Sequence, residues 1–302
     1  MKSPMVEYRK GDPVAHDGHI ARSNGRWADD KLSFLDRYLA PALTVAARHF
    51  CHRVYVDLFA GPGVFFDARA REFLPGGAIR VLDALGEPAR ARRAQFTHAI
   101  LVNLDEDDHD ALTARVDALH AEGRLTVPRQ NIQVINDDAN AVVRRLARMM
   151  PPRPYVFAFV DPEKPGHWPW ASCQALRASV PGALDLYLLY PGMMGVNRAI
   201  SYRGNPLERA LTAYFGCDDW RRIARARRTD AESPEMRQEL EALYERQLAT
   251  LGLAHVLRPR RIYRTGACEL YTMFFASRKP VALKLAEWEM DTVSPQLGLF
   301  AG

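Results

Sequence analysis

One ten-residue stretch, VYVDLFAGPG at positions 54–63, constrains the fold more than any other part of this chain. It is an apolar, β-prone run that ends in an acid, Asp57, and then turns through Gly61 and Gly63. Glycine permits tight turns and close approach of the backbone to a bound molecule, because it lacks a Cβ. A buried strand followed by such a turn is typical of the carboxyl edge of a parallel sheet, where α/β proteins bind ligands. A plain structural turn is the alternative interpretation.

Further apolar runs recur along the chain and predict the rest of the sheet. The expected strands are 54–60, 98–104, 131–137, 155–160 and 184–190. Each run is continuously apolar, as is usual for strands that are buried on both faces. The expected helices are 27–50 before the first strand and 78–93, 107–122, 140–150 and 170–179 between and after the others. This alternation predicts a doubly wound, mostly parallel α/β sheet.

After residue 190 the alternation stops. Residues 235–251 predict one more helix, and 255–263 and 270–277 predict two strands that a turn at Gly266 joins into an antiparallel hairpin. We therefore predict a methyltransferase-like Rossmann fold, with this C-terminal hairpin at the edge of the sheet and a helical insertion. The expected divisions are a polar N-terminal arm at 1–26, a Rossmann core at 27–190, a cap or insertion at 191–233 and a segment at 234–302 that completes the core.

Composition limits the classes of protein to consider. The chain has 302 residues, 48% of them hydrophobic, which is enough for one large domain. Its four cysteines are far apart and form no C-x-x-C pair, so we expect neither a metal site nor a disulfide framework. No apolar run reaches about 18 residues, so we expect a cytoplasmic protein without membrane contact. The net charge of +5 permits an anionic partner without requiring one.

The acid in the glycine stretch indicates what kind of cofactor the loop binds. The third glycine of the dinucleotide fingerprint is missing, and Asp57 precedes the glycines. A carboxylate at this place repels phosphates and attracts a cation. S-adenosylmethionine carries a sulfonium and an ammonium, so the loop is expected to bind this methyl donor. The predicted contacts come from Asp57, Phe59, Ala60, Gly61 and Gly63.

Two more acids follow the next predicted strands. Asp105 stands where an acid that binds the ribose hydroxyls is expected, beyond an apparent inserted loop at 65–77. Asp138 is the candidate for the exocyclic amine of the adenine, with Asn140 opening the helix beside it. Capping of the following helix is the alternative role of Asp105 and of Asp138, and for Asp138 the two roles are compatible.

The acceptor end of the site is expected after the fourth strand, in the sequence FVDPEKPGHW. Asp161 and Pro162 correspond to the short motif with which amino-directed methyltransferases bind the amine of the nucleophile. Glu163 and Lys164 replace the second proline and the aromatic of that motif, which argues against a flipped-out DNA base as the acceptor. Lys164 is a candidate for holding an anionic group of the acceptor, and a solvated lysine is the alternative.

Two further features have both a functional and a structural interpretation. Trp168 and Trp170 are either a stacking platform for the acceptor or residues of the core. The basic run at 221–228 is either a solvated helix face or a contact for a phosphate or a partner. The sequence does not decide between these alternatives.

Taken together, the motifs resemble a known family, the three-Cys-motif partner proteins (TcmP). The matching pieces are, in order, WADDKLSFLDRYL, YVDLFAGPG, GGAIRVLDAL, INDDAN, FAFVDP and LDLYLLYPGMMGVNR. The resemblance implies a fold like that of S-adenosylmethionine-dependent methyltransferases and a partner protein with a three-cysteine, radical-SAM-like cluster motif. Carried over residue by residue, it places donor binding on Asp57, Ala60, Gly61 and Gly63, the adenine at Asp138 and the reaction at Asp161 and Pro162.

Three functions are consistent with these motifs. The leading hypothesis is a methyltransferase of unidentified acceptor, in which positioning supplies most of the catalysis and Asp161 orients or deprotonates the acceptor. The second is a nucleic-acid amino-methyltransferase. The third is a non-catalytic protein that binds the donor or its product and serves a radical-SAM-like partner. The sequence does not indicate an oligomeric state.

Overall fold

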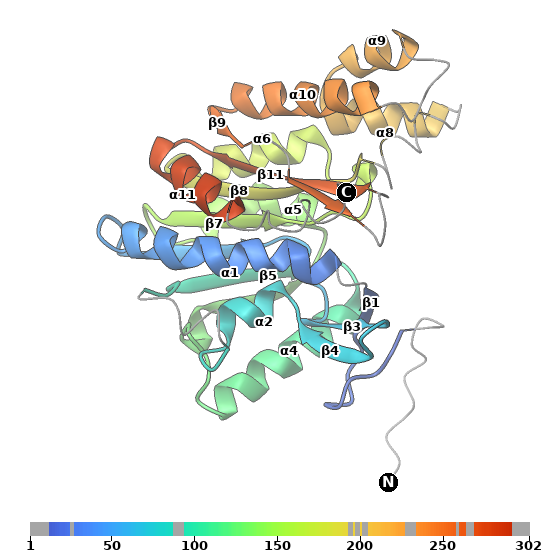
Figure 1. Ribbon diagram of the computed structural model, residues 1–302. Helices are drawn as coiled ribbons and strands as arrows, with labels where there is room; N and C mark the ends of the chain where they lie inside the picture. The colour runs from blue at the N-terminus through green and yellow to red at the C-terminus, as the bar shows by residue number, and fades with distance from the viewer. Residues whose placement is uncertain are drawn as a thin grey trace, which may run out of the picture.

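A central β-sheet organises the molecule, as the computed structural model in Figure 1 shows. The structure describes residues 12–24, 27–86, 94–192, 196, 200, 205–226, 234–257, 260–263 and 269–291. The parallel strands of the sheet are β2 (Arg53–Asp57), β5 (His98–Asn103), β6 (Ile132–Asn136), β7 (Tyr155–Val160) and β8 (Ala183–Tyr190). All five predicted strands are therefore confirmed.

The C-terminal strands complete one edge of this sheet. β11 (Glu269–Ser277) pairs antiparallel with β8, and β10 (Arg260–Tyr263) and β9 (His255–Val256) pair antiparallel with β11. The strand order is β10-β11-β8-β7-β2-β5-β6, which places β2 in the middle of the five parallel strands. This is the predicted methyltransferase-like Rossmann fold with its antiparallel C-terminal pair. The expected turn at Gly266 lies outside the described residues.

Helices cover both faces of the sheet (Figure 1). One face carries α1 (Trp27–Ala46), α2 (Gly77–Leu82), α4 (Glu106–Ala121) and α11 (Pro280–Asp291). The other carries α5 (Ala139–Arg145), α6 (Trp170–Ser179), α8 (Asn205–Phe215), α9 (Asp219–Ala226) and α10 (Pro234–Thr250). Tyr55 of β2 packs into the first layer, and its neighbours Val54 and Val56 pack into the second. Burial on both faces is the reason that the strands are continuously apolar.

A second, small sheet was not predicted. In it β1 (Arg22–Asn24) pairs parallel with β3 (Val64–Asp67), which pairs antiparallel with β4 (Glu72–Pro75). The region expected to be an inserted loop is therefore a hairpin, and part of the N-terminal arm is a strand. This sheet fixes the N-terminal segment next to the loop that follows β2.

Several predicted boundaries need correction. The helix expected at 78–93 ends at Leu82, because Asp83 turns into an extended conformation and bridges to Leu125. Residues 87–93 lie outside the described part of the chain. The predicted strand 255–263 is interrupted between β9 and β10, and α11 follows β11 where no helix was expected. Within the described ranges, none of the helices has the length and hydropathy needed to cross a bilayer.

Candidate functional site

The predicted acids converge on the carboxyl edge of the sheet. Asp57 is the last residue of β2, and Asp105, Asp138 and Asp161 come one or two residues after β5, β6 and β7. β2 lies between β5 and β7, and β6 lies next to β5, so these four strand ends are neighbours. The structure therefore places all four acids along one edge, as expected for strands that run parallel.

The loop after β2 turns sharply at two glycines. The Ala60 N–H donates to the Val102 carbonyl of β5 at 3.0 Å, which holds the loop on the sheet. Gly61 and Gly63 then adopt φ values of 62° and 85°, in the left-handed region that favours glycine. A Cβ on Gly63 would also lie 2.8 Å from a side-chain carbon of Leu112. The sequence pattern thus corresponds to a sharply turned, closely packed loop at the end of β2.

Asp57 is buried beside this loop, with 1% of its surface exposed. Its Oδ2 accepts a hydrogen bond from the Tyr55 hydroxyl at 2.9 Å, and its Oδ1 accepts one from the Phe59 N–H at 3.2 Å. Burial raises the pKa of Asp57 to about 7; the two hydrogen bonds and Lys31 act in the opposite direction, and Asp161 adds to the rise. The carboxyl therefore titrates near neutral pH, and a cationic ligand at the loop would favour its ionised form.

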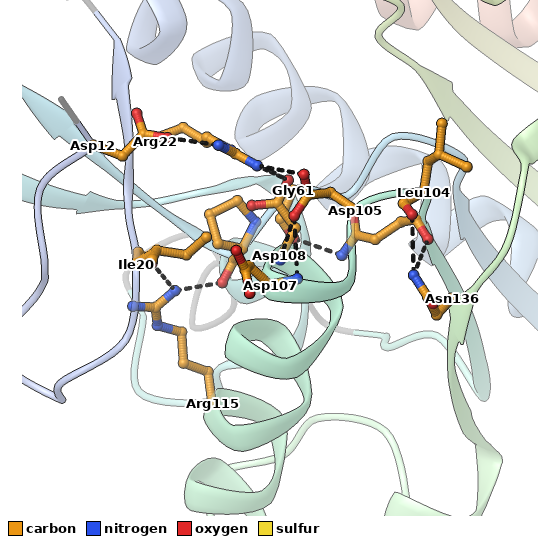
Figure 2. Close-up of polar contacts among 12 residues, drawn as sticks. Asp12, Ile20, Arg22, Gly61, Leu104, Asp105, Asp107, Asp108, Arg115 and Asn136 are labelled. Atoms are coloured by element: carbon orange, nitrogen blue, oxygen red, sulfur yellow. Dashed lines mark hydrogen bonds and ion pairs between the residues drawn. The ribbon is translucent and has the colours of Figure 1, made fainter. Parts of the chain in front are cut away.

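Asp105 has partners on both of its carboxyl oxygens (Figure 2). Oδ1 accepts from the backbone N–H groups of Asp107 and Asp108 at 3.1 and 3.4 Å, so Asp105 caps α4. Oδ2 forms an ion pair with Arg22 at 3.4 Å, and the same guanidinium binds Asp108 at 2.9 Å and Asp12 at 2.6 Å. The capping alternative is therefore confirmed. Contact with a ribose remains a prediction, and it would have to share Oδ2 with Arg22.

Residues 12–24, which we call the N-terminal strap, are held next to the glycine loop by Arg115 of α4. Arg115 is buried, and its Nη1 donates to the Ile20 carbonyl at 3.0 Å and to the Pro62 carbonyl at 2.5 Å (Figure 2). Its Nε also pairs with Asp17 at 2.7 Å. One guanidinium therefore links the strap to the loop. Sequence reasoning missed both Arg22 and Arg115, because Asp108 and Ile20, which they bind, lie 86 and 95 positions away from them in the chain.

Asp138 and Asn140 stabilise the start of α5. Asp138 Oδ1 accepts from the backbone and the side-chain amide of Asn140, both at 2.8 Å. The Asn140 side chain in turn donates to the His167 carbonyl at 3.1 Å and accepts from the Ser172 hydroxyl at 2.6 Å. Helix capping by Asp138 is thus confirmed. Asp138 is nevertheless exposed, so its predicted contact with an adenine is sterically open.

Asp161 forms an ion pair with Lys31 of α1, which was not predicted. The Lys31 ammonium contacts Asp161 Oδ2, and the two side chains are 11% and 20% exposed. The ring centroids of Phe159 and Tyr271 lie 5.9 and 5.8 Å from the same ammonium. One signal in the sequence could have revealed this contact: Lys31 lies one helical turn before Leu35, on the apolar face of the predicted helix.

The residues after Asp161 contribute less to this edge. Pro162 is buried, whereas Lys164 is exposed and forms no ion pair with the other residues that the structure describes. Trp168 and Trp170 are both buried, at 0% and 5% exposure. They belong to the core, and the stacking platform considered for them is wrong.

The basic run at 221–228 is described only up to residue 226. Arg221 forms ion pairs with Glu208 at 2.6 Å and Asp218 at 2.8 Å. Arg227 and Arg228 lie outside the described residues. The role of the run as a whole therefore remains a prediction.

The carboxyl edge is chemically suited to a cationic nucleoside. A tight glycine loop, a buried acid that titrates near neutrality and two further acids at successive strand ends offer acceptors for ammonium, hydroxyl and amine groups. A metal site has no comparable support: in the described ranges, His, Cys, Asp and Glu side chains do not gather in threes that could hold an ion.

Comparison with known proteins gives only distant similarities. No family model and no curated protein matches the chain. It is similar to protein LPL1258 from Legionella pneumophila at 12% identity, over 89% of this chain and 92% of that one, with a TM-score of 0.47. It is also similar to Trm1 from Pyrococcus horikoshii, solved with S-adenosyl-L-methionine, at 13% identity over 88% and 58% of the two chains (TM-score 0.43). An O-methyltransferase from Bacillus cereus, solved with SAH, is 8% identical over 80% of each chain (TM-score 0.42).

Similarities of this degree say nothing about the chemistry of the chain. The resemblance to the TcmP family likewise stays a prediction, because no family model matches. What the site binds has to be inferred from its own residues. Those residues are the glycine loop, the acids at the strand ends and the cations that hold them.

Proposed function

We propose that this chain is an S-adenosylmethionine-dependent methyltransferase. The observation that carries the proposal is that Asp57, Asp105, Asp138 and Asp161 lie, together with one glycine loop, along the carboxyl edge of a sheet with the methyltransferase-like strand order. Acids in this position attract a sulfonium and an ammonium and oppose a pyrophosphate. A dinucleotide is therefore the less favourable ligand.

In this proposal each acid binds a different part of the donor. Asp57 supplies negative charge for the cationic amino-acid part, Asp105 accepts from the ribose next to Arg22, and Asp138 accepts from the adenine amine. The loop residues Phe59, Ala60, Gly61 and Gly63 supply backbone and van der Waals contacts. When bound, the donor supplies an electrophilic methyl group.

Asp161 serves the acceptor. Lys31 holds Asp161 Oδ2, while Oδ1 has no hydrogen-bond partner among the described residues. That oxygen is available to orient an N–H or O–H group of the acceptor and to take its proton. Most of the rate enhancement would come from holding the nucleophile in line with the methyl group. Lys164, exposed on the same loop, is proposed only as a contact for an anionic acceptor.

The family resemblance extends the proposal to a partner. A three-cysteine, radical-SAM-like protein would supply or receive the molecule that is methylated, and the acceptor itself is an unidentified amine or hydroxyl compound. A nucleic acid as acceptor is less favoured, because Arg221 already pairs with two acids. A non-catalytic protein that binds the donor would differ from the proposed enzyme only in lacking turnover.

Calorimetry with S-adenosylmethionine tests the proposal. We expect the wild-type chain to bind and Asp57→Ala to bind at least about tenfold more weakly, because a hydrogen bond or ion pair to a charged group is lost. Asp110→Ala is the matched control, since that acid is exposed on α4 and, among the described residues, forms an ion pair only with His109. No binding by the wild type, or equal binding by Asp57→Ala, would contradict the donor site.

A methyl-transfer screen then separates enzyme from accessory protein. Tritium-labelled donor would be incubated with the chain and with nucleic-acid, protein and metabolite fractions of the host. Label transfer into one fraction identifies the acceptor class. Tight donor binding without transfer to any fraction would favour the non-catalytic alternative.

A further inference from the structure

The ion pair between Lys31 and Asp161 places an amine of the chain itself at the acceptor end of the site. The Lys31 ammonium contacts the Asp161 carboxylate directly, at the end of β7. Its charge also influences Asp57, the acid of the donor loop, as does that of Asp161. Lys31 Nζ therefore contacts the acid assigned to the acceptor and lies within electrostatic range of the acid assigned to the donor.

We propose that Lys31 is itself a methylation site, with a methylsulfonium nucleoside bound at the glycine loop as the source of the methyl group. The inference rests on the proposed function, and it adds an acceptor that the chain provides. It requires no other substrate, so it can be tested without knowing the natural one.

Lys31 is held as a substrate amine would have to be held. Its side chain is only 11% exposed, and the rings of Phe159 and Tyr271 lie 5.9 and 5.8 Å from the ammonium. The backbone of the same residue is fixed as well, because its carbonyl accepts from the Tyr187 hydroxyl at 3.2 Å. A lysine side chain normally has many rotamers. Contacts from β7, β8 and β11 reduce that freedom and orient the nitrogen, which is the main requirement for a transfer between positioned groups.

The transfer balances with the groups present. The Lys31 ammonium gives one proton to the Asp161 carboxylate and becomes a neutral amine. The nitrogen lone pair then forms a bond to the methyl carbon as the carbon–sulfur bond breaks, and that electron pair remains on sulfur as a thioether. Asp161 releases its proton to water. One ammonium and one sulfonium thus give one methylated ammonium, one neutral thioether nucleoside and one proton.

The surroundings of Lys31 also suit the product. Aromatic rings bind methylated ammonium groups, because such cations are large and weakly hydrated. One N–H must remain to donate to Asp161, so the pair is kept in the mono- and dimethylated forms and lost in the trimethylated form. We therefore expect the mono- and dimethylated forms to be better stabilised at this site than the trimethylated form.

A different role for Lys31 leads to a different result. If the lysine only positions Asp161, it keeps its mass when the donor is bound. Lys164 provides an internal control, because it is exposed and only a few residues beyond Asp161 in the chain. Non-specific methylation of accessible amines would modify Lys164 at least as much as Lys31.

Peptide mass spectrometry after incubation with isotopically labelled S-adenosylmethionine tests the inference, with donor binding measured by calorimetry on the same samples. We expect labelled methyl groups on Lys31 of the wild type, none in Lys31→Arg or Asp161→Asn, and donor binding by Lys31→Arg within about threefold of the wild type. Circular dichroism would check that both variants fold. If Asp161→Asn does not fold, the inference is still tested by whether the wild type carries the label on Lys31 and Lys31→Arg carries none.

Each other outcome overturns the inference. Donor binding without label on Lys31 leaves the proposed function intact and reduces Lys31 to a positioning residue. Label spread over Lys164 and other exposed lysines shows non-specific chemistry. Failure of the wild type to bind the donor overturns the proposed function together with this inference.

Discussion

Two buried aspartates near opposite ends of the parallel strands differ in their surroundings: one is fully bound within the protein, and the other is the acid for which we propose a ligand. Asp185 lies in β8 and is 4% exposed. Its carboxylate accepts from the hydroxyls of Tyr38 at 2.6 Å, Tyr155 at 2.7 Å and Ser277 at 2.6 Å. These donors come from α1, β7 and the end of β11, so the carboxylate joins three elements to β8.

Asp57 has fewer partners than Asp185. It accepts one side-chain hydroxyl, from Tyr55, and one backbone N–H, from Phe59. Burial raises the pKa of both aspartates. Three hydroxyls compensate the buried charge of Asp185, whereas Asp57 retains capacity for a cation at the adjacent loop. Unused hydrogen-bonding capacity, more than burial, therefore distinguishes the proposed ligand site from the structural aspartate.

A cavity at the opposite end of the parallel strands offers less for a polar ligand than the carboxyl edge does. A cavity of about 390 Å³ lies beside Asp185, between α1 and α11, with Tyr155 and Ala183 at the first positions of β7 and β8 in its wall. Its lining is mostly apolar, and the carboxylate in it is already bound by three hydroxyls. The cavity therefore has no set of unused polar groups comparable with the acids of the carboxyl edge.

Removing the structural aspartate should have the largest effect. We expect Asp185→Ala to lower the free energy of unfolding by about 3 kcal/mol, because three buried hydroxyls lose their acceptor at about 1 kcal/mol each. Denaturant titration measures this loss. The donor affinity of the folded fraction should be unchanged, and Tyr38→Phe, which removes one of the three bonds, should cost about 1 kcal/mol. An Asp185→Ala variant that is as stable as the wild type but binds the donor more weakly would contradict the structural role of Asp185 and the donor role of Asp57.

Asp57→Asn should give the opposite pattern. We expect at least about a tenfold loss of donor affinity by calorimetry, since the amide cannot supply the charge. The free energy of unfolding should not fall above about pH 7, because burying the ionised carboxyl is unfavourable there. An equal loss of stability in Asp57→Asn and Asp185→Ala would show that both aspartates are structural.

The pH dependence of donor binding tests the same difference between Asp57 and Asp185. The pKa of Asp57 is raised from 3.8 to about 7, so the carboxyl becomes ionised in the folded protein only near neutral pH. Donor affinity should therefore rise as pH increases through about 7 and be flat over that range in Asp57→Asn. For stability the sign is reversed: the folded chain binds its proton more tightly, so the contribution of Asp57 is full below pH 3.8 and is lost as pH rises to about 7. Calorimetric titrations at a series of pH values measure the first effect.

The smallest expected effect is a shift of that pH profile. Tyr55→Phe removes a hydrogen bond that lowers the pKa of Asp57, so the midpoint of donor binding should move to higher pH. Tyr155→Phe removes the corresponding bond to Asp185 and should leave the midpoint in place. If the two variants had identical pH profiles of donor binding, the Tyr55 hydroxyl would have no influence on the pKa of Asp57, and the prediction would be wrong.

The parts of the fold that the sequence predicted are those that are buried on both faces. The central strands are continuous apolar runs because helices cover both sides, and their parallel order brings the acids that follow them to one edge. The small sheet was missed because its strands are only half-buried: Glu72 and Pro75 at the ends of β4 are exposed. Its pattern resembles that of a loop, and only pairing with β1 makes it a sheet.

Part of the candidate site was predictable in the same way. The positions of the four acids could be predicted because each lies at or directly after the end of a strand, and helix capping could be predicted as the alternative role of Asp105 and Asp138. Lys31, Arg22 and Arg115 could not be assigned in the same way. Each reaches the glycine loop or a strand-end acid through a partner at least 53 positions away, and such contacts follow from tertiary packing that a single sequence does not specify.

A crystal structure of the chain with S-adenosylhomocysteine would test the central claim most directly. The account predicts the nucleoside across the ends of β2, β5 and β6, with its ribose at Asp105 and its sulfur facing the Lys31–Asp161 pair. A nucleoside bound in the cavity beside Asp185, or one that leaves the glycine loop uncontacted, would contradict it.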